Sequence, residues 1–87
     1  MHDLVYAERF IDDMCAVYSP ALRTRIFKAI ELLRDNPELG SAAVPRGVTD
    51  RFGTNVRRLV EAPFLIVYKI VGDEVWILGL MHSRQAY

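Results

Sequence analysis

Five side chains in the second half of the sequence have the chemistry of a catalytic or binding site. Arg57 and Arg58 are adjacent, and His82, Arg84 and Tyr87 lie close together near the last residue. A guanidinium can hold a phosphate or a carboxylate through two parallel hydrogen bonds, a histidine exchanges a proton near neutral pH, and a tyrosine can stack on a base. If the two arginines lie on a strand, alternation places only one of them on each face of the sheet.

Each of these side chains also has a purely structural interpretation. One of the two arginines can form a salt bridge to an acidic side chain such as Glu61, and His82 can be a partly buried histidine that closes a sheet. Tyr87 can belong to a frayed terminus. Both interpretations are compatible with the sequence.

The sequence contains no pattern for a cofactor or a metal ion. His2, His82 and the single Cys15 do not form a spaced set of metal ligands, and no glycine-rich phosphate-binding loop is present. We therefore predict a protein without cofactor or metal. Cys15 is interpreted as a small buried hydrophobic residue, and Trp76 as a core residue.

The composition favours one compact domain that covers residues 1–87. Of these residues 52% are hydrophobic and 25% are charged, which excludes intrinsic disorder. The 11 basic and 11 acidic residues give a net charge of zero, which argues against nucleic-acid binding by bulk electrostatics. A domain of this size buries only about two-thirds of the surface that its unfolded chain exposes, so a partner that completes the core is expected.

The charges are nevertheless uneven along the chain. Residues 1–18 have a net charge of −3, and residues 44–60 have a net charge of +3. The single cysteine cannot form an internal disulfide, and no signal peptide or membrane-length apolar run is visible. These features predict a cytoplasmic protein with an acidic end and a basic middle.

The first half of the sequence is predicted to be helical after a short strand. Residues 2–6 are expected as a strand and residues 7–18 as an amphipathic helix. Ser19 and Pro20 have the residue types of an N-cap and a first helical position, and a second helix is predicted to end at Asn36-Pro37. Two helices joined by so few residues form an antiparallel hairpin.

The second half is predicted to be a long loop followed by a sheet. Residues 36–54 are rich in proline and glycine and are expected as a loop, with at most a short irregular strand. Strands are expected at 56–60, 64–71 and 75–81, with a two-residue turn at Gly72-Asp73. The fold class is therefore α+β, with the helix hairpin packed on one face of an antiparallel sheet. The second face is expected to leave an exposed apolar patch.

The sequence resembles the RelE/ParE superfamily of toxins from bacterial type II toxin–antitoxin systems. The resemblance covers nearly the whole chain and is most specific in three segments, namely Arg57-Arg58-Leu59, the apolar strand that ends in Tyr68, and the apolar strand that ends in His82-Ser83-Arg84. It implies a small α+β toxin that is neutralised by a cognate antitoxin. RelE-like members cut messenger RNA on the ribosome, whereas ParE-like members are not nucleases and poison DNA gyrase.

The RelE-like activity would assign roles to the five side chains. Metal-independent RNA cleavage needs a base for the 2′-hydroxyl, a cation for the charged phosphorane and an acid for the leaving oxygen. Arg57 or Arg58 would hold the phosphate, His82 would act as the acid or base, and Arg84 and Tyr87 would complete the site.

The charge balance favours the ParE-like activity over the RelE-like one. RelE-like nucleases are strongly basic, whereas this chain is neutral and has only Lys28 and Lys69 as lysines. We therefore expect an action on DNA gyrase, with the ribosome and messenger RNA as the alternative target, and a non-toxic interaction module on the same fold as a further alternative. The antitoxin is expected to be acidic where it meets the basic middle of the chain. The residues predicted to contact partners are Arg46, Arg51, Arg57, Arg58, Met81, His82 and Arg84.

Overall fold

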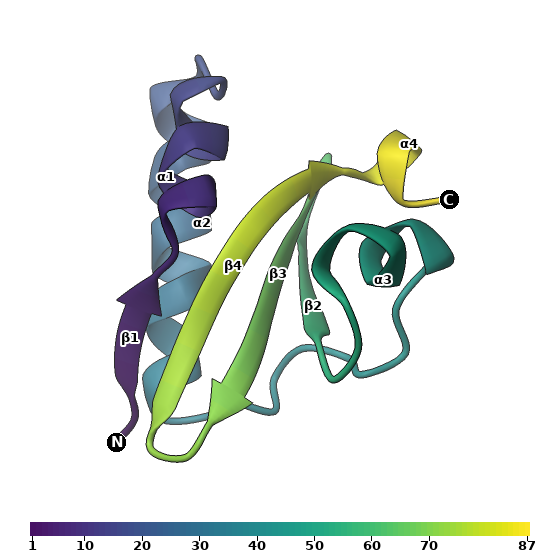
Figure 1. Cartoon of the computed structure of the whole chain (residues 1–87). Coiled ribbons are helices and arrows are strands. Elements are labelled where there is room, and N and C mark those ends of the chain that lie inside the picture. Colours follow the sequence, from purple (N-terminus) through teal and green to yellow (C-terminus); the bar gives the residue numbers. More distant parts are fainter.

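A computed structural model describes all residues from 1 to 87, and its elements follow the predicted order with two short helices added, one in the predicted loop and one after the last strand (Figure 1). The elements, in chain order, are β1 (Asp3–Tyr6), α1 (Glu8–Cys15), α2 (Pro20–Glu31), the short 3-10 helix η1 (Leu32–Arg34), α3 (Arg46–Phe52), β2 (Arg57–Glu61), β3 (Phe64–Val71), β4 (Glu74–His82) and α4 (Ser83–Ala86). The α+β class is confirmed.

Four strands form one mixed sheet in the order β1-β4-β3-β2. The predicted meander of β2, β3 and β4 is antiparallel, and β1 adds to β4 in parallel. The turn at Gly72-Asp73 is confirmed, and Gly72 has a φ of 58°, which explains why a residue without a Cβ stands there.

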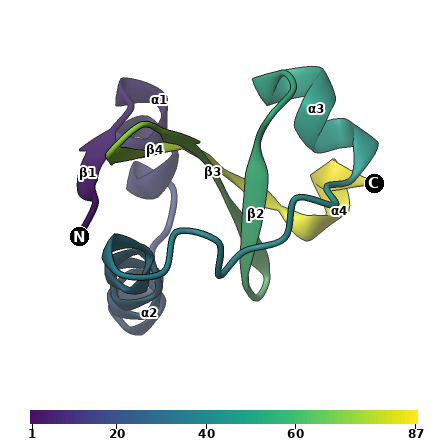
Figure 2. The ribbon, with the colours of Figure 1, turned by 90° about the horizontal axis from the view of Figure 1, so that it is seen from below.

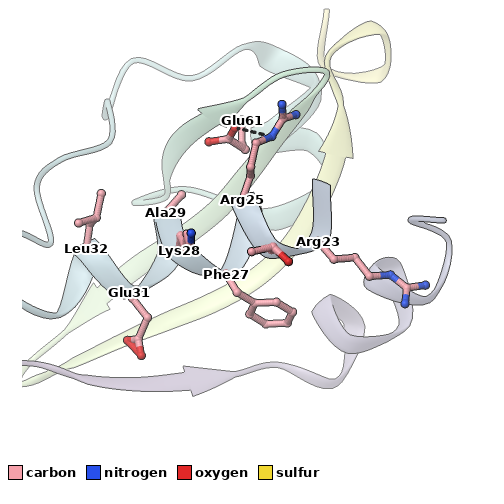
Figure 3. Close-up of a pocket in the computed structure, with 9 residues that line it drawn as sticks. Arg23, Arg25, Phe27, Lys28, Ala29, Glu31, Leu32 and Glu61 are labelled. Carbon is pink, nitrogen blue, oxygen red and sulfur yellow. Dashed lines mark ion pairs between the residues drawn. The ribbon is translucent and has the colours of Figure 1, made fainter. Parts of the chain in front are cut away.

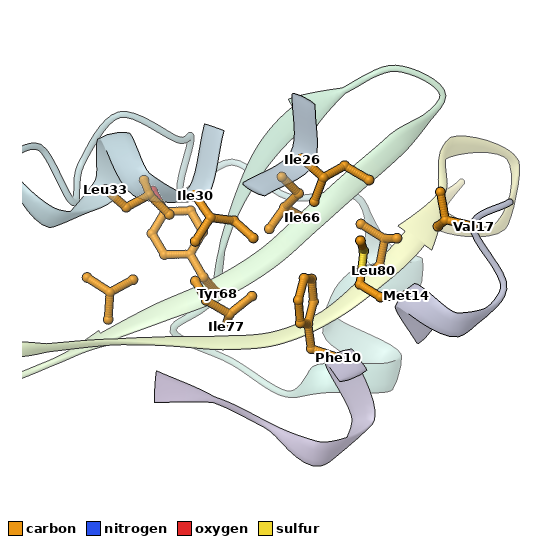
Figure 4. Close-up of a cluster of buried hydrophobic side chains, with 11 residues drawn as sticks. Phe10, Met14, Val17, Ile26, Ile30, Leu33, Ile66, Tyr68, Ile77 and Leu80 are labelled. Carbon is orange, nitrogen blue, oxygen red and sulfur yellow. The ribbon is translucent and has the colours of Figure 1, made fainter. Parts of the chain in front are cut away.

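The face of the sheet toward α2, called the first face below, holds the larger core. Ile66 and Tyr68 of β3 and Ile77 of β4 pack against the inner side of α2, from which Ile26 and Ile30 project (Figure 4). The helix begins as predicted, because the Ser19 side chain accepts a hydrogen bond from the Leu22 N–H and Pro20 occupies the first helical position.

Helix α1 runs antiparallel to α2 and lies along the edge of β4 beyond the end of β1. Phe10 and Met14 of α1 belong to the same core cluster as the inner residues of α2. The Ala7 N–H donates to the Ile77 carbonyl oxygen at 2.9 Å, and the Asp13 carboxylate accepts from the Leu80 N–H at 3.0 Å. The carboxylate thus takes the place of a neighbouring strand at this part of the β4 edge.

The prediction that residues 36–54 form only a loop is wrong, because they contain α3. Figure 2 shows α3 and α4 on the opposite side of the sheet from α2. Val48 of α3 and Ala86 of α4 are fully buried against Leu65 and Met81, in a second core cluster. The prediction of an open apolar patch is therefore wrong for most of this second face, because α3 and α4 cover it.

Two assignments to the core are also wrong. Cys15 is exposed on α1, because one residue after the buried Met14 the helix has turned by about 100°. Trp76 is 37% exposed, and its indole N–H donates to the Glu74 carboxylate. It lies on the second face at the end of the sheet that carries the Gly72 turn, while α3 and α4 cover the part of that face around Leu65 and Met81.

Candidate functional site

The register of the sheet separates the predicted site residues onto two faces. Arg57 pairs with Tyr68, whose ring lies in the core of the first face, whereas Arg58 pairs with Val67 of the second core cluster. His82 pairs with Phe64, which packs against the first core. The predicted split of the two arginines is thus confirmed, and His82 lies on the face opposite to Arg58.

Arg57 is held by the main chain of the preceding loop. One terminal nitrogen of its guanidinium donates to the Gly40 carbonyl oxygen at 2.7 Å and to the Glu38 carbonyl oxygen at 3.2 Å. Its Nε is buried and has no hydrogen-bond partner. Arg57 makes no salt bridge to Glu61, which pairs with Arg25 of α2 instead. The side chain thereby fixes the loop against β2.

His82 is used to begin α4. Its Nδ1 accepts a hydrogen bond from the Arg84 N–H, and its own N–H donates to the Gln85 side chain, so the two residues form a capping box. The imidazole ring packs edge-on against Phe64, with ring centroids 5.7 Å apart. The structural interpretation of this histidine, as the residue that closes the sheet, accounts for these contacts.

Arg58 and Tyr87 meet on the second face. The Arg58 Nε donates to the Ala43 carbonyl oxygen at 2.9 Å, and one of its terminal nitrogens lies 3.5 Å from the Tyr87 hydroxyl oxygen. Tyr87 is 83% exposed. The ring is therefore both anchored at its hydroxyl and available to a partner.

The second face also carries most of the predicted partner contacts. Arg46 and Arg51 are exposed on α3 and Arg84 is exposed on α4, and α3 and α4 pack together over this side of the sheet. We call Arg46, Arg51, Arg58, Arg84 and Tyr87 the basic face. The one acidic side chain of α3 is Asp50, whose carboxylate oxygen lies 3.9 Å from the Arg46 Nε.

Three other predicted partner contacts do not belong to the basic face. Met81 is 1% exposed and fills the second core, so its assignment as a contact residue is wrong. Arg57 and His82 lie on the first face, where each is occupied by the contacts described above. Of the partner residues, Arg46, Arg51, Arg58 and Arg84 lie on the side of the sheet that α3 and α4 cover.

A surface hollow of about 850 Å³ lies along α2 and contains none of the predicted residues. Figure 3 shows its lining on both flanks of the helix, with Arg25 paired to Glu61 on one flank and Phe27 on the other. No histidine, serine or cysteine lines it. Phe27 is 42% exposed. The sequence analysis did not single it out, although its position outside the buried side of α2, which carries Ile26 and Ile30, indicates a surface residue.

No group of three or more histidine, cysteine, aspartate or glutamate side chains is arranged to hold a metal ion. None of the helices has the length and apolar character needed to cross a membrane.

Comparison with protein families decides the classification. The family described as "ParE toxin of type II toxin-antitoxin system, parDE" matches residues 4–87. The chain belongs to this toxin family. The predicted resemblance to the RelE/ParE superfamily is thereby confirmed. No curated protein matches the sequence.

Solved structures of other toxins share the fold of this toxin. RelE in the RelB–RelE antitoxin–toxin complex from Methanococcus jannaschii superposes with a TM-score of 0.64 at 18% identity, over 92% of this chain and 91% of that chain. YafQ from Escherichia coli strain BL21(DE3) gives a TM-score of 0.62 at 18% identity, over 97% and 96% of the two chains. The E. coli DinJ–YafQ complex gives 0.60 at 17% identity, over 100% and 99%.

Proposed function

We propose that this toxin arrests growth by binding a protein target, DNA gyrase, and that it does not cut RNA. The observation that carries the proposal is the division of the candidate catalytic residues between the two faces of the sheet. Arg58 and Tyr87 lie on the second face, His82 lies on the first, and Arg57 is bound to carbonyl oxygens of its own chain.

RNA cleavage requires that the phosphate-binding cation and the acid or base reach the same phosphodiester. Each group must lie within hydrogen-bond distance of its atom in the reacting nucleotide. Arg58 and His82 are separated by the thickness of the sheet and point away from each other. This separation favours a binding function over a nuclease function.

The basic face has the composition of a protein-binding surface. Arginine and tyrosine are the residue types most enriched among the side chains that dominate binding energy at protein interfaces, together with tryptophan. The basic face offers three arginines on the packed helices α3 and α4, together with Arg58 of β2 and the exposed Tyr87. We assign the gyrase contact to this surface.

We further propose that a cognate antitoxin neutralises the toxin. RelE and YafQ, two toxins with the same fold, were crystallised with RelB and DinJ. The net charge of +3 on residues 44–60, which include two arginines of α3 and Arg58, calls for acidic side chains on an antitoxin that covers this surface. The antitoxin would then block the surface that the target needs.

Inducible expression in a bacterial host tests this function. We expect growth arrest, intact messages and an induced DNA-damage response, with relief of the arrest by the reading frame that lies beside the toxin gene. Arg51→Ala and Arg84→Ala, two exposed positions of the basic face, should weaken the arrest. Lys28→Ala, the matched loss of a cation on α2, should not change it.

Three outcomes would contradict the proposal. Messages cut within translated frames, in a manner that His82→Ala abolishes, would establish the nuclease alternative. Unaffected growth at a verified level of folded toxin would establish a non-toxic interaction module. An arrest that the neighbouring reading frame does not relieve would remove the proposed antitoxin.

A further inference from the structure

The second face of the sheet is open at the end that carries the turn between β3 and β4. Helix α3 ends at Phe52, whose ring occupies the space that a Cβ at Gly79 would fill. The Arg9 guanidinium lies over the same ring, with its central carbon 4.5 Å from the ring centroid. Closer to the turn, Trp76 and Val71 are 37% and 40% exposed. The cover that α3 provides therefore stops at Phe52.

Three neighbouring strands contribute side chains to this open part of the second face. The register places Val5 of β1 and Lys69 of β3 on either side of Trp76 of β4, and it places Val71 beside Glu74 one row closer to the turn. Directly paired residues project from the same face of a sheet. We call Val5, Lys69, Val71, Glu74 and Trp76 the tryptophan patch. It combines an exposed apolar centre with one cation and one anion.

The two charged side chains of the tryptophan patch are held differently. The Glu74 carboxylate accepts a hydrogen bond from the Trp76 indole N–H at 3.2 Å, which fixes it beside the ring. Lys69 is partly buried and forms no salt bridge within its own chain. A charge that loses its water without gaining a partner destabilises a complex. A molecule that covers the tryptophan patch must therefore offer a carboxylate to Lys69 and a cation to Glu74.

We propose that the tryptophan patch binds the same patch of a second copy of this chain, in a dimer with twofold symmetry. In such an interface every contact occurs twice, so Lys69 of each copy pairs with Glu74 of the other. Because Trp76 neighbours both charged residues in its own sheet, the two indole rings lie next to each other near the twofold axis. The tryptophan patch is thus its own complement in charge and in apolar surface. The inference depends neither on the target nor on the antitoxin.

A partner with charge of a single sign fits the tryptophan patch less well. An acidic segment would pair with Lys69, but it would also place carboxylates against Glu74 and against Asp3, which is exposed in the same row. A basic segment would be repelled by Lys69 and by the exposed Arg9. A second copy supplies both signs of charge.

Mixing two charge-reversal variants of the full-length toxin tests the pairing by sedimentation equilibrium. Lys69→Glu makes both charges of the patch acidic and Glu74→Lys makes both basic, so we expect each variant alone to self-associate at least about tenfold more weakly than wild type. In an equimolar mixture, position 69 of one variant meets the opposite charge at position 74 of the other, and we expect a heterodimer of wild-type strength. Asp12→Lys, a charge reversal at an exposed position of α1, should dimerise like wild type.

Two results of this experiment would overturn the inference. One is a wild-type toxin that sediments as a monomer at its highest soluble concentration. The other is a mixture of folded Lys69→Glu and Glu74→Lys variants, verified by circular dichroism, that associates no better than either variant alone.

Removing the apolar centre tests the same interface without a change of charge. Trp76→Thr keeps a residue type that favours strands, and we expect its self-association to be at least about tenfold weaker. Tyr18→Thr, at a position that is 88% exposed, should associate like wild type. This pair of variants keeps the inference testable if a charge-reversal variant does not fold. Unchanged self-association of Trp76→Thr, with weakened binding to the antitoxin or to gyrase, would assign the tryptophan patch to that partner and contradict the inference.

Discussion

At the scale of single residues, polar side chains that could serve a functional site instead hold the main chain in place. Tyr68 is fully buried, and its hydroxyl donates to the Pro37 carbonyl oxygen at 2.7 Å and accepts from the Gly40 N–H at 2.9 Å. Arg57 binds carbonyl oxygens of the same loop. Together they hold residues 37–40 against the sheet, which sets the starting point of the chain that leads to α3.

Removing the Tyr68 hydroxyl should therefore lower the stability of the fold. Tyr68→Phe leaves the Pro37 carbonyl and the Gly40 N–H without this partner, and we expect the free energy of unfolding to fall by about 2–3 kcal/mol. Urea unfolding measures the change. Tyr18→Phe, at a position that is 88% exposed, is the matched control and should have no effect. Equal stability of the two variants would show that the hydroxyl does not hold the loop.

Tyr6 should make the stability fall at alkaline pH. Burial, and secondarily the Glu31 carboxylate, raises the pKa of the Tyr6 phenol above its ordinary value of 10.0, although Arg34 acts in the opposite direction. A raised pKa favours the protonated form in the folded state, so the contribution is complete below pH 10 and is lost as the pH rises through the folded pKa. We expect the unfolding free energy of Tyr6→Phe to decline less steeply above about pH 10 than that of wild type. Identical slopes would refute this assignment.

The residue types of the site could be read from the sequence, but their grouping could not. Alternation correctly placed Arg57 and Arg58 on opposite faces, since that depends only on their being adjacent in a strand. The face of His82 depends on the register between β3 and β4 and on the irregularity between Val67 and Tyr68. Neither is encoded in the spacing of the residues themselves.

At the scale of elements, the sequence predicts those whose apolar periodicity is strong and misses those that depend on tertiary contacts. The strands and α2 have clear patterns, and Ser19 and Pro20 mark the start of that helix. Helix α3 has only seven residues, includes Gly47 and has no side-chain N-cap hydrogen bond. It forms because Val48 is buried against the second face of the sheet.

The packing of α3 against α4 gives a prediction in which two effects compete. Helix propensity alone would make Gly47→Ala stabilising by about 1 kcal/mol. A Cβ at Gly47 would, however, lie 2.5 Å from the Ala86 carbonyl oxygen and 2.7 Å from that of Gln85. We expect the clash to dominate, with a net loss of about 1–2 kcal/mol in thermal or urea unfolding.

A matched substitution in the same helix checks the sign of this effect. Asp50→Ala gains helix propensity at an exposed position without meeting α4, so its stability should be equal to or above that of wild type. If Gly47→Ala were as stable as Asp50→Ala, the close contact between α3 and α4 would not be a determinant of the fold.

At the scale of the whole molecule, the neutral net charge hides two surfaces of opposite character. The basic face lies on one side of the sheet over α3 and α4, and the acidic residues of the first elements, Asp3 and Glu8, bracket β1. The uneven charge was visible in the sequence, but the fold was needed to show that α3 and α4 carry the arginines together.

The central claim is that the toxin acts on DNA gyrase through the basic face. The most direct measurement is a gyrase cleavage assay with purified toxin, gyrase, ATP and supercoiled plasmid. We expect the wild-type toxin to trap cleaved plasmid, Arg51→Ala and Arg84→Ala to do so more weakly, and Lys28→Ala to match wild type. Gyrase that stays fully active with folded toxin, while the same preparation cuts messages on translating ribosomes, would contradict the claim.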